Sequence, residues 1–109
     1  MNNINDISVE ELSEKLNENP HLKVLDVREE AEFEEVNLNT PLLPLSRIRL
    51  MEIELIEDWK EEEVIVFCQS GVRSLEACLL LKTFGFENVV NLKGGLKAWL
   101  EHFPKENMK

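Results

Sequence analysis

Residues 68–74 carry the strongest indication of chemistry in this chain, and we call them the Cys68 loop. Their sequence is Cys-Gln-Ser-Gly-Val-Arg-Ser, and they directly follow the apolar run of residues 64–67. A β-branched run without alternation predicts a strand buried on both faces. The cysteine therefore stands where open α/β folds bind ligands, and before a helix whose free N–H groups favour negative charge. We expect such a thiol to ionise easily.

The residues after the cysteine supply what a nucleophilic thiolate needs. A free cysteine titrates at about 8.5, so a reactive one requires local positive potential. Gly71 lets the backbone curl so that successive N–H groups converge on the sulfur, as in an anion-binding nest. Arg73 adds a permanent charge that can face a bound oxyanion or brace the loop through a carboxylate. We predict Cys68 as the nucleophile, in an active-site loop made of Gln69, Ser70, Gly71, Val72, Arg73 and Ser74.

Several of these residues also have a purely structural interpretation. Ser74 is either a substrate contact or the N-cap of the following helix. Cys68 itself could be a buried cysteine beside a tight turn, with Arg73 on the surface. The order of strand, glycine loop, arginine and helix favours the active site instead. Cys78 lies among leucines at helical spacing, so we expect it in the core.

Two other pairs of residues are weaker candidates. Asp26 and Arg28 flank the end of the first predicted strand and could support the site, although a structural ion pair is the favoured interpretation. His21 and His102 are far apart in the sequence and have no third ligand at a suitable spacing, so we expect no metal site.

The elements that position the loop can be read from hydrophobic spacing and capping signals. In chain order we expect a helix from Ser8 to about residue 17, a strand over 22–27, a helical turn over 28–33, a short extended piece at 42–43, a helix over 46–56, a strand over 64–67, a helix over 74–84, a strand at 89–90 and a helix after Gly94-Gly95. Strands that alternate with helices imply a parallel sheet covered on both faces. The predicted fold class is therefore α/β.

Length and charge restrict the possible classes of function. The 109 residues allow one core, so we expect a single domain over residues 1–109. The formal net charge of −10 argues against nucleic acid and anionic membranes as partners. The stretch from Met1 to Asp6 lacks the basic and apolar blocks of a signal peptide, and no apolar run approaches a bilayer span. We expect a cytoplasmic monomer.

Several motifs follow one another over most of the chain. They are Leu25-Asp26-Val27-Arg28-Glu29 with Glu32-Phe33, the strand and loop of residues 64–74, Gly85-Phe86-Glu87-Asn88-Val89, and Leu92-Lys93-Gly94-Gly95 through Trp99. In this order they resemble a single-domain rhodanese of the thiosulfate sulfurtransferase family. The segment 36–41 departs from the commonest pattern of that family, Gly-His-Ile-Pro-Gly-Ala. That change concerns the path of the loop more than the chemistry, because Cys68, Gly71 and Arg73 are intact.

The resemblance implies a fold and a mechanism. The fold is a five-stranded parallel sheet flanked by helices, with the backbone from Gln69 to Arg73 as a cradle for Cys68. A small anionic donor such as thiosulfate leaves its outer sulfur on Cys68 as a persulfide and releases sulfite. A thiophilic acceptor then takes the sulfur: cyanide in the laboratory, dithiols or partner proteins in the cell. No metal or organic cofactor is required.

Two other functions remain open from the sequence. A cysteine-loop phosphatase or arsenate reductase also seats an oxyanion over a thiolate, but its loop places five residues between cysteine and arginine. Here only four separate Cys68 from Arg73, which should suit one sulfur atom and crowd a tetrahedral phosphate. The domain could also be a protein-docked persulfide carrier or a non-catalytic binding module. The physiological donor, the acceptor and the pathway are not encoded in any motif.

Overall fold

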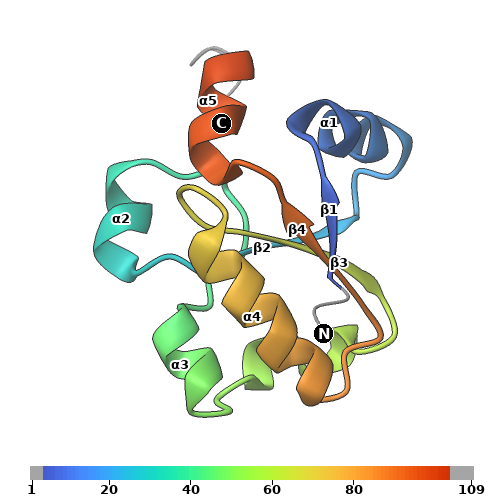
Figure 1. Cartoon of the computed structure of the whole chain (residues 1–109), viewed down its shortest axis with the longest axis vertical. Helices are drawn as coiled ribbons and strands as arrows, with labels where there is room; N and C mark the ends of the chain where they lie inside the picture. Colours follow the sequence, from blue (N-terminus) through green and yellow to red (C-terminus); the bar gives the residue numbers. More distant parts are fainter. Residues whose placement is uncertain (1–3, 104–109) are drawn as a thin grey trace.

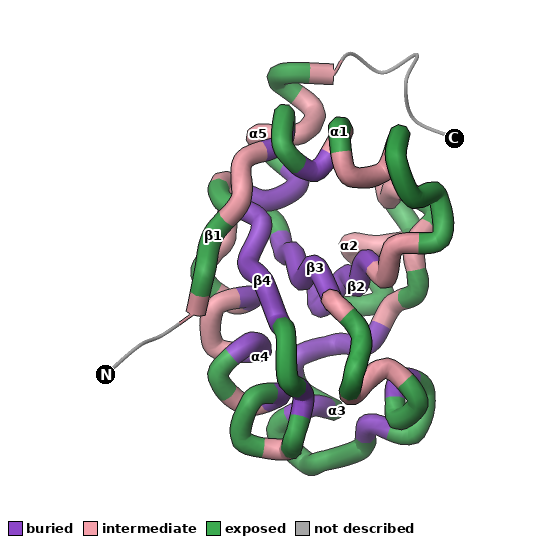
Figure 2. Tube along the Cα trace, turned by 90° about the vertical axis from the view of Figure 1, so that its right-hand side faces the viewer, coloured by how far each residue is buried: buried purple, intermediate pink, exposed green. Residues whose placement is uncertain are grey.

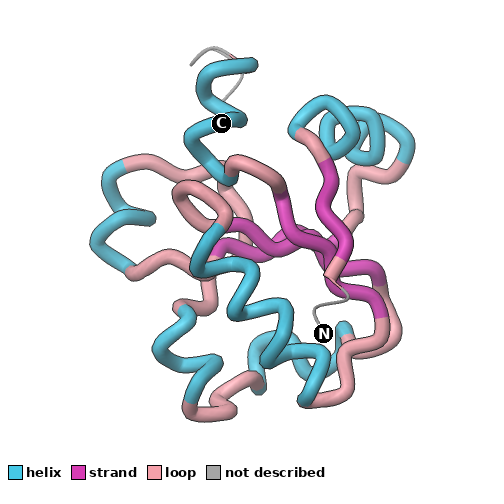
Figure 3. Tube along the Cα trace, in the orientation of Figure 1, coloured by secondary structure: helices cyan, strands magenta, loops and turns pink. Residues whose placement is uncertain are grey.

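Four parallel strands form the centre of the molecule. In the computed structural model, which describes residues 4–103, the spatial order is β1-β4-β3-β2 (Figures 1 and 3). The strands are β1 (Asn5–Ile7), β2 (Lys23–Asp26), β3 (Glu63–Phe67) and β4 (Asn88–Leu92). β2, β3 and β4 are largely buried, whereas β1 is exposed at one edge (Figure 2). The α/β class with a parallel sheet is confirmed.

The described part of the chain has four strands rather than five. At the place of a fifth strand, a single bridge joins Asp26 and Leu42. The N–H of Asp26 donates to Pro41 O at 3.0 Å, and the N–H of Leu43 donates to Asp26 O at 2.9 Å. The N–H of Leu45 also donates to Val27 O at 3.0 Å, but Pro41 has no N–H to continue the pairing toward the start of β2, so no regular strand forms. β1, in contrast, was not predicted, since its three residues carry no hydrophobic pattern.

Helices cover both faces of the sheet. α1 (Val9–Glu18) and α5 (Gly95–His102) pack over one face, while α3 (Leu45–Arg49) and α4 (Val72–Thr83) pack over the other (Figure 1). Side chains of β3 alternate between the two cores, as expected for a strand with period two. Val64 and Val66 lie in the core under α3 and α4, while Ile65 and Phe67 lie in the core under α1 and α5. No helix within residues 4–103 has the length and apolar character needed to span a bilayer.

The capping box predicted at the start of the first helix is present. Ser8 Oγ accepts the N–H of Glu11 at 3.1 Å, and Glu11 Oε1 accepts the N–H of Ser8 at 2.8 Å. The helix places Leu12 in the core. Residues 1–3 lie outside the described part of the chain, and so does part of the stretch on which the expectation of a cytoplasmic protein rests.

The single helix expected over residues 46–56 is wrong. α3 ends at Arg49, the chain turns through Met51 with a φ of 59°, and it resumes as the 3-10 helix η1 (Glu54–Trp59). The turn lets Ile53 and Ile56 join the core from a separate element. Leu50, which a single helix over residues 46–56 would place on its apolar face, is 70% exposed.

Candidate active site

The Cys68 loop joins the carboxyl end of β3 to the start of α4 and wraps around the sulfur. Gly71 is the N-cap of α4 and has a φ of 104°, a conformation that favours glycine. The N–H groups of Gly71 and Ser74 both donate to Cys68 Sγ, at 3.1 and 3.3 Å. The interpretation of Ser74 as the N-cap is wrong, because Ser74 lies in the first turn of α4. Its buried hydroxyl lies 3.4 Å from the sulfur.

The two cysteines have opposite electrostatic surroundings. Burial raises the pKa of the Cys68 thiol. The hydrogen bond with the Ser74 side chain, and then those with the backbone of Ser74, Gly71 and Ser70, outweigh burial, so the pKa is lowered. Burial raises the pKa of Cys78 to about 12. The prediction that Cys78 belongs to the core is confirmed, and both cysteines are free thiols.

The first turn of α5 holds the loop through two backbone hydrogen bonds. The N–H of Leu96 donates to Cys68 O at 2.8 Å, and the N–H of Lys97 donates to Gln69 O at 3.0 Å. Figure 1 shows the loop, drawn in yellow, against the start of α5. This approach requires Gly95, where a Cβ would overlap both carbonyl oxygens and where φ is 61°. The sequence predicted Gly94-Gly95 only as the entry to a helix, so this support for the loop was missed.

Arg73 ties the loop to α2 (Glu30–Glu35). Its guanidinium donates to both carboxylate oxygens of Glu32, at 2.7 and 2.8 Å. The hydrogen bond from Arg73 is the main reason why the pKa of Glu32 falls to about 2. Of the two roles considered for Arg73, the structure therefore shows the bracing contact.

The sequence profile of the Rhodanese-like domain matches residues 8–102, which include every contact of the Cys68 loop just described. The chain belongs to the rhodanese-like family. A sulfurtransferase from Allochromatium vinosum is 35% identical over 100 residues, a match that spans 91% of each chain. The putative sulfur carrier protein YrkF from Bacillus subtilis is 33% identical over 97 residues, which are 88% of this chain and 51% of that protein.

Solved structures of the family agree with the fold. The rhodanese-like domain protein from Staphylococcus aureus superimposes with a TM-score of 0.78 at 30% sequence identity. The match covers 88% of this chain and 91% of that protein.

In this rhodanese-like domain, Asp26 and Arg28 form a buried ion pair beneath α2. The closest contact, Arg28 Nη2 to Asp26 Oδ2, is 2.8 Å long, and the two side chains are 1% and 0% exposed. Arg28 also donates to Val36 O at 2.7 Å and to Glu32 O at 3.4 Å, so it fixes the end of α2. The structure therefore shows a structural ion pair that supports the helix carrying Glu32.

The side chains of three other loop residues lie at the surface. Gln69 and Ser70 are exposed, and Val72 is 75% exposed. Cys68 as a residue is only 1% exposed. The loop therefore covers the thiol, and its backbone contributes more to the contacts around the sulfur than these side chains do.

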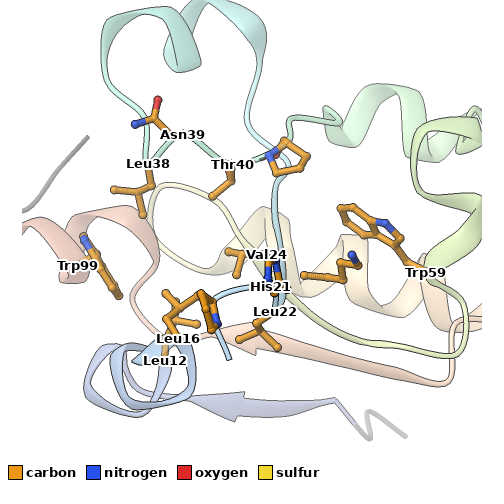
Figure 4. A pocket seen from close by; sticks show the side chains of 13 residues that line it. Leu12, Leu16, His21, Leu22, Val24, Leu38, Asn39, Thr40, Trp59 and Trp99 are labelled. Carbon is orange, nitrogen blue, oxygen red and sulfur yellow. Dashed lines mark hydrogen bonds between the residues drawn. The ribbon is translucent and has the colours of Figure 1, made fainter. Parts of the chain in front are cut away.

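A cavity of about 440 Å³ lies apart from the loop (Figure 4). It opens between α1, β2 and residues 38–41, with Trp99 at one end and Trp59 at the other, and no residue of the Cys68 loop lines it. His21 lines this cavity, whereas His102 is elsewhere, with its Nδ1 3.5 Å from Oε2 of Glu10. Within residues 4–103, no group of three or more His, Cys, Asp or Glu side chains is arranged to hold a metal.

Proposed function

We propose that this chain is a sulfurtransferase in which Cys68 carries the transferred sulfur as a persulfide. The observation that carries the proposal is the Cys68 sulfur at the end of β3, held by two backbone N–H groups and with a lowered pKa. A thiolate is the nucleophilic form of cysteine, and the loop favours that form. The relative from Allochromatium vinosum is named a sulfurtransferase, which supports the same class of reaction.

The proposed reaction has two displacements. The Cys68 thiolate attacks the outer sulfur of thiosulfate, a new S–S bond forms, and sulfite leaves with the electron pair of the broken bond. The persulfide anion keeps one negative charge and can accept the loop N–H groups that held the thiolate. A nucleophilic acceptor, cyanide or a thiolate, then takes the outer sulfur and regenerates the Cys68 thiolate. Covalent catalysis of this kind gives ping-pong kinetics.

Thiosulfate is a suitable donor despite the negative charge of the protein. The formal net charge is −10, but exposed charges beyond about 10 Å are largely screened at moderate ionic strength. The oriented N–H groups and the start of α4 act at short range, where a small anion must bind. We expect no cofactor to take part in either displacement.

A persulfide carrier is the second candidate, because one relative is named a putative sulfur carrier protein. An enzyme and a carrier both need Cys68 and differ in the partner that delivers sulfur. We therefore propose to compare steady-state rates with thiosulfate and cyanide against rates with a persulfide-bearing protein. A substantial thiosulfate rate supports the enzyme. A poor thiosulfate rate with rapid transfer between proteins supports the carrier.

We predict no useful phosphatase activity. Four residues separate Cys68 from Arg73, and Arg73 is already engaged by Glu32. The loop therefore offers a small space for one sulfur atom and no free guanidinium for a tetrahedral phosphate. The measurement is hydrolysis of an aryl phosphate by the wild-type protein. Turnover that disappears in Cys68→Ser would contradict the prediction.

The Arg73–Glu32 pair should affect turnover much more than stability. Glu32→Gln is expected to lower sulfur transfer about tenfold with thiosulfate and with an uncharged sulfane donor alike, because it loosens the loop. The pair is partly exposed, so unfolding should become easier by about 1 kcal/mol or less. Arg49→Gln, which breaks the similar exposed pair with Glu76 at 2.8 Å, is the matched control.

The same pair predicts a pH dependence. The pKa of Glu32 is lowered in the folded protein to about 2, so its contribution is fully present above the unfolded pKa and is lost as pH falls through the folded value. The Arg73–Glu32 pair should therefore remain intact over the usual pH range of an assay.

For the two substitutions, a tenfold loss of turnover in Arg49→Gln, or no loss in Glu32→Gln, would show that the Arg73–Glu32 pair does not position the loop.

A further inference from the structure

A line of hydrogen bonds runs from the Cys68 sulfur to the surface through three side chains. Cys68 Sγ lies 3.4 Å from Ser74 Oγ, which lies 2.5 Å from Asn91 Oδ1. Asn91 Nδ2 lies 3.1 Å from Asp6 Oδ1. Ser74 is 0% and Asn91 5% exposed, whereas Asp6 is exposed. Parallel pairing of β1 with β4 places Asp6 opposite Asn91, although neither residue belongs to the Cys68 loop.

The orientation of the Asn91 amide follows from its neighbours. The NH₂ group has two hydrogens and faces two acceptors, the Asp6 carboxylate at 3.1 Å and Gly71 O at 3.5 Å. A reversed amide would place Oδ1 against a carboxylate, and neither oxygen could donate a hydrogen bond. Asn91 Oδ1 must therefore face Ser74.

Ser74 has a single hydroxyl proton to give. In the observed arrangement it donates this proton to Asn91 Oδ1 and accepts the S–H of Cys68. A thiolate has no hydrogen to donate, so Ser74 stabilises it, and contributes to the lowered pKa of Cys68, only when it turns its proton to the sulfur. That turn leaves Asn91 Oδ1 buried without a donor, which is costly. The amide of Asn91 thus opposes ionisation of the thiol, while the loop N–H groups favour it.

We propose that Asn91, oriented by Asp6, is a positioning residue that determines where the Ser74 hydroxyl directs its proton and thereby restrains the nucleophilicity of Cys68. The inference rests on the proposed role of Cys68 as the nucleophile. It adds two residues outside the loop to the control of that nucleophile, one of them at the surface of β1.

The other charged or titratable groups around the sulfur are not altered by a substitution at Asp6. Arg73, on α4, interacts favourably with the charge of Cys68 and is paired with Glu32 of α2. Cys78, also on α4, has a pKa raised to about 12 and therefore remains a neutral thiol at the pH values below that. Asp6 is the acidic group that contacts the network itself.

Asp6→Asn tests the proposal with little change in volume at an exposed position. An amide at position 6, unlike the carboxylate, can donate to Asn91 Oδ1, so the Asn91 amide can reverse against only the long contact with Gly71 O at 3.5 Å. The reversed amide donates to Ser74 Oγ and frees the hydroxyl proton for the thiolate. One such hydrogen bond to a charged group should increase the thiolate fraction about tenfold on the acid limb. Nucleophilicity falls as the pKa falls, so alkylation should become about threefold faster on the acid limb and about threefold slower at the alkaline plateau.

The measurement is the pH–rate profile of iodoacetamide alkylation at Cys68, followed by mass spectrometry. Glu14→Gln is the matched control, because it removes one exposed carboxylate from α1 and should leave the profile unchanged. In a Ser74→Ala background, Asp6→Asn should have no effect, since no hydroxyl remains to be directed. An unchanged profile in Asp6→Asn, or the same shift with and without Ser74, would overturn the proposal.

This readout is independent of sulfur transfer. If the wild-type protein takes up no sulfur but its alkylation profile responds to Asp6→Asn as described, the proposed function fails and the inference about the thiol stands. If sulfur uptake is normal and the profile does not respond, only the inference fails.

Discussion

Replacing Cys68 with serine is expected to abolish turnover of thiosulfate, with a loss of at least about a thousandfold. Removal of a covalent nucleophile leaves only the contribution of the binding site, and serine has no thiolate to offer at neutral pH. The measurement is thiocyanate formation from thiosulfate and cyanide by purified proteins.

Cys78→Ala is the matched control for this prediction. Cys78 is fully buried in α4, and burial raises its pKa to about 12, so it is not available as a nucleophile. The Cys78→Ala protein should retain turnover within a few-fold per folded molecule. If Cys68→Ser keeps its activity, or if turnover is lost in Cys78→Ala instead, the assignment of the nucleophile to Cys68 is wrong.

Gly95→Ala should damage both stability and activity. A Cβ at this position would overlap Cys68 O and Gln69 O, and the φ of 61° is unfavourable for alanine. Overpacking and the left-handed backbone together should cost about 2–4 kcal/mol. For a chain of this size the melting temperature should fall on the order of 10 °C. Because the loop must move away from α5, turnover of the remaining folded protein should fall about a hundredfold.

Gly85→Ala separates the effect on the loop from the backbone effect. Gly85 ends α4 with a φ of 102°, but a Cβ there meets only Lys60 Cδ at 3.8 Å. This variant should lose stability only because alanine is unfavourable at the left-handed φ of Gly85, and it should keep full turnover per folded molecule. Equal losses of turnover in both glycine variants would show that the contact between α5 and the loop has no role in activity.

The parts of the site that the sequence predicted are those encoded by neighbouring residues. The apolar run before Cys68 predicts a buried strand, and Gly71 three residues later predicts the turn that the structure shows at a φ of 104°. The capping box at Ser8 is equally local. Each of these signals lies within a few residues and follows from backbone geometry.

The partners of the loop could not be predicted in this way. Glu32 lies 41 residues before Arg73, and Asp6 lies 85 residues before Asn91. Only the folded chain brings these residues together, and β1 itself could not be predicted because its three residues carry no hydrophobic pattern. The available signal was Asn91, a polar residue between apolar neighbours in β4, which becomes buried and must find hydrogen-bond partners.

The helix expected over residues 46–56 failed for a different reason. Apolar spacing records which residues prefer burial, and it does not show that one continuous helix buries them. Ile48 and Ile56 are both fully buried, but they belong to α3 and to η1, which are separated by the turn at Met51.

The central claim is that Cys68 carries sulfur, and intact mass measured after incubation with thiosulfate tests it most directly. We expect the wild-type protein to gain the mass of one sulfur atom, cyanide to remove it, and Cys68→Ser to gain nothing. A wild-type protein without added sulfur, or a Cys68→Ser protein that gains it, would contradict the account.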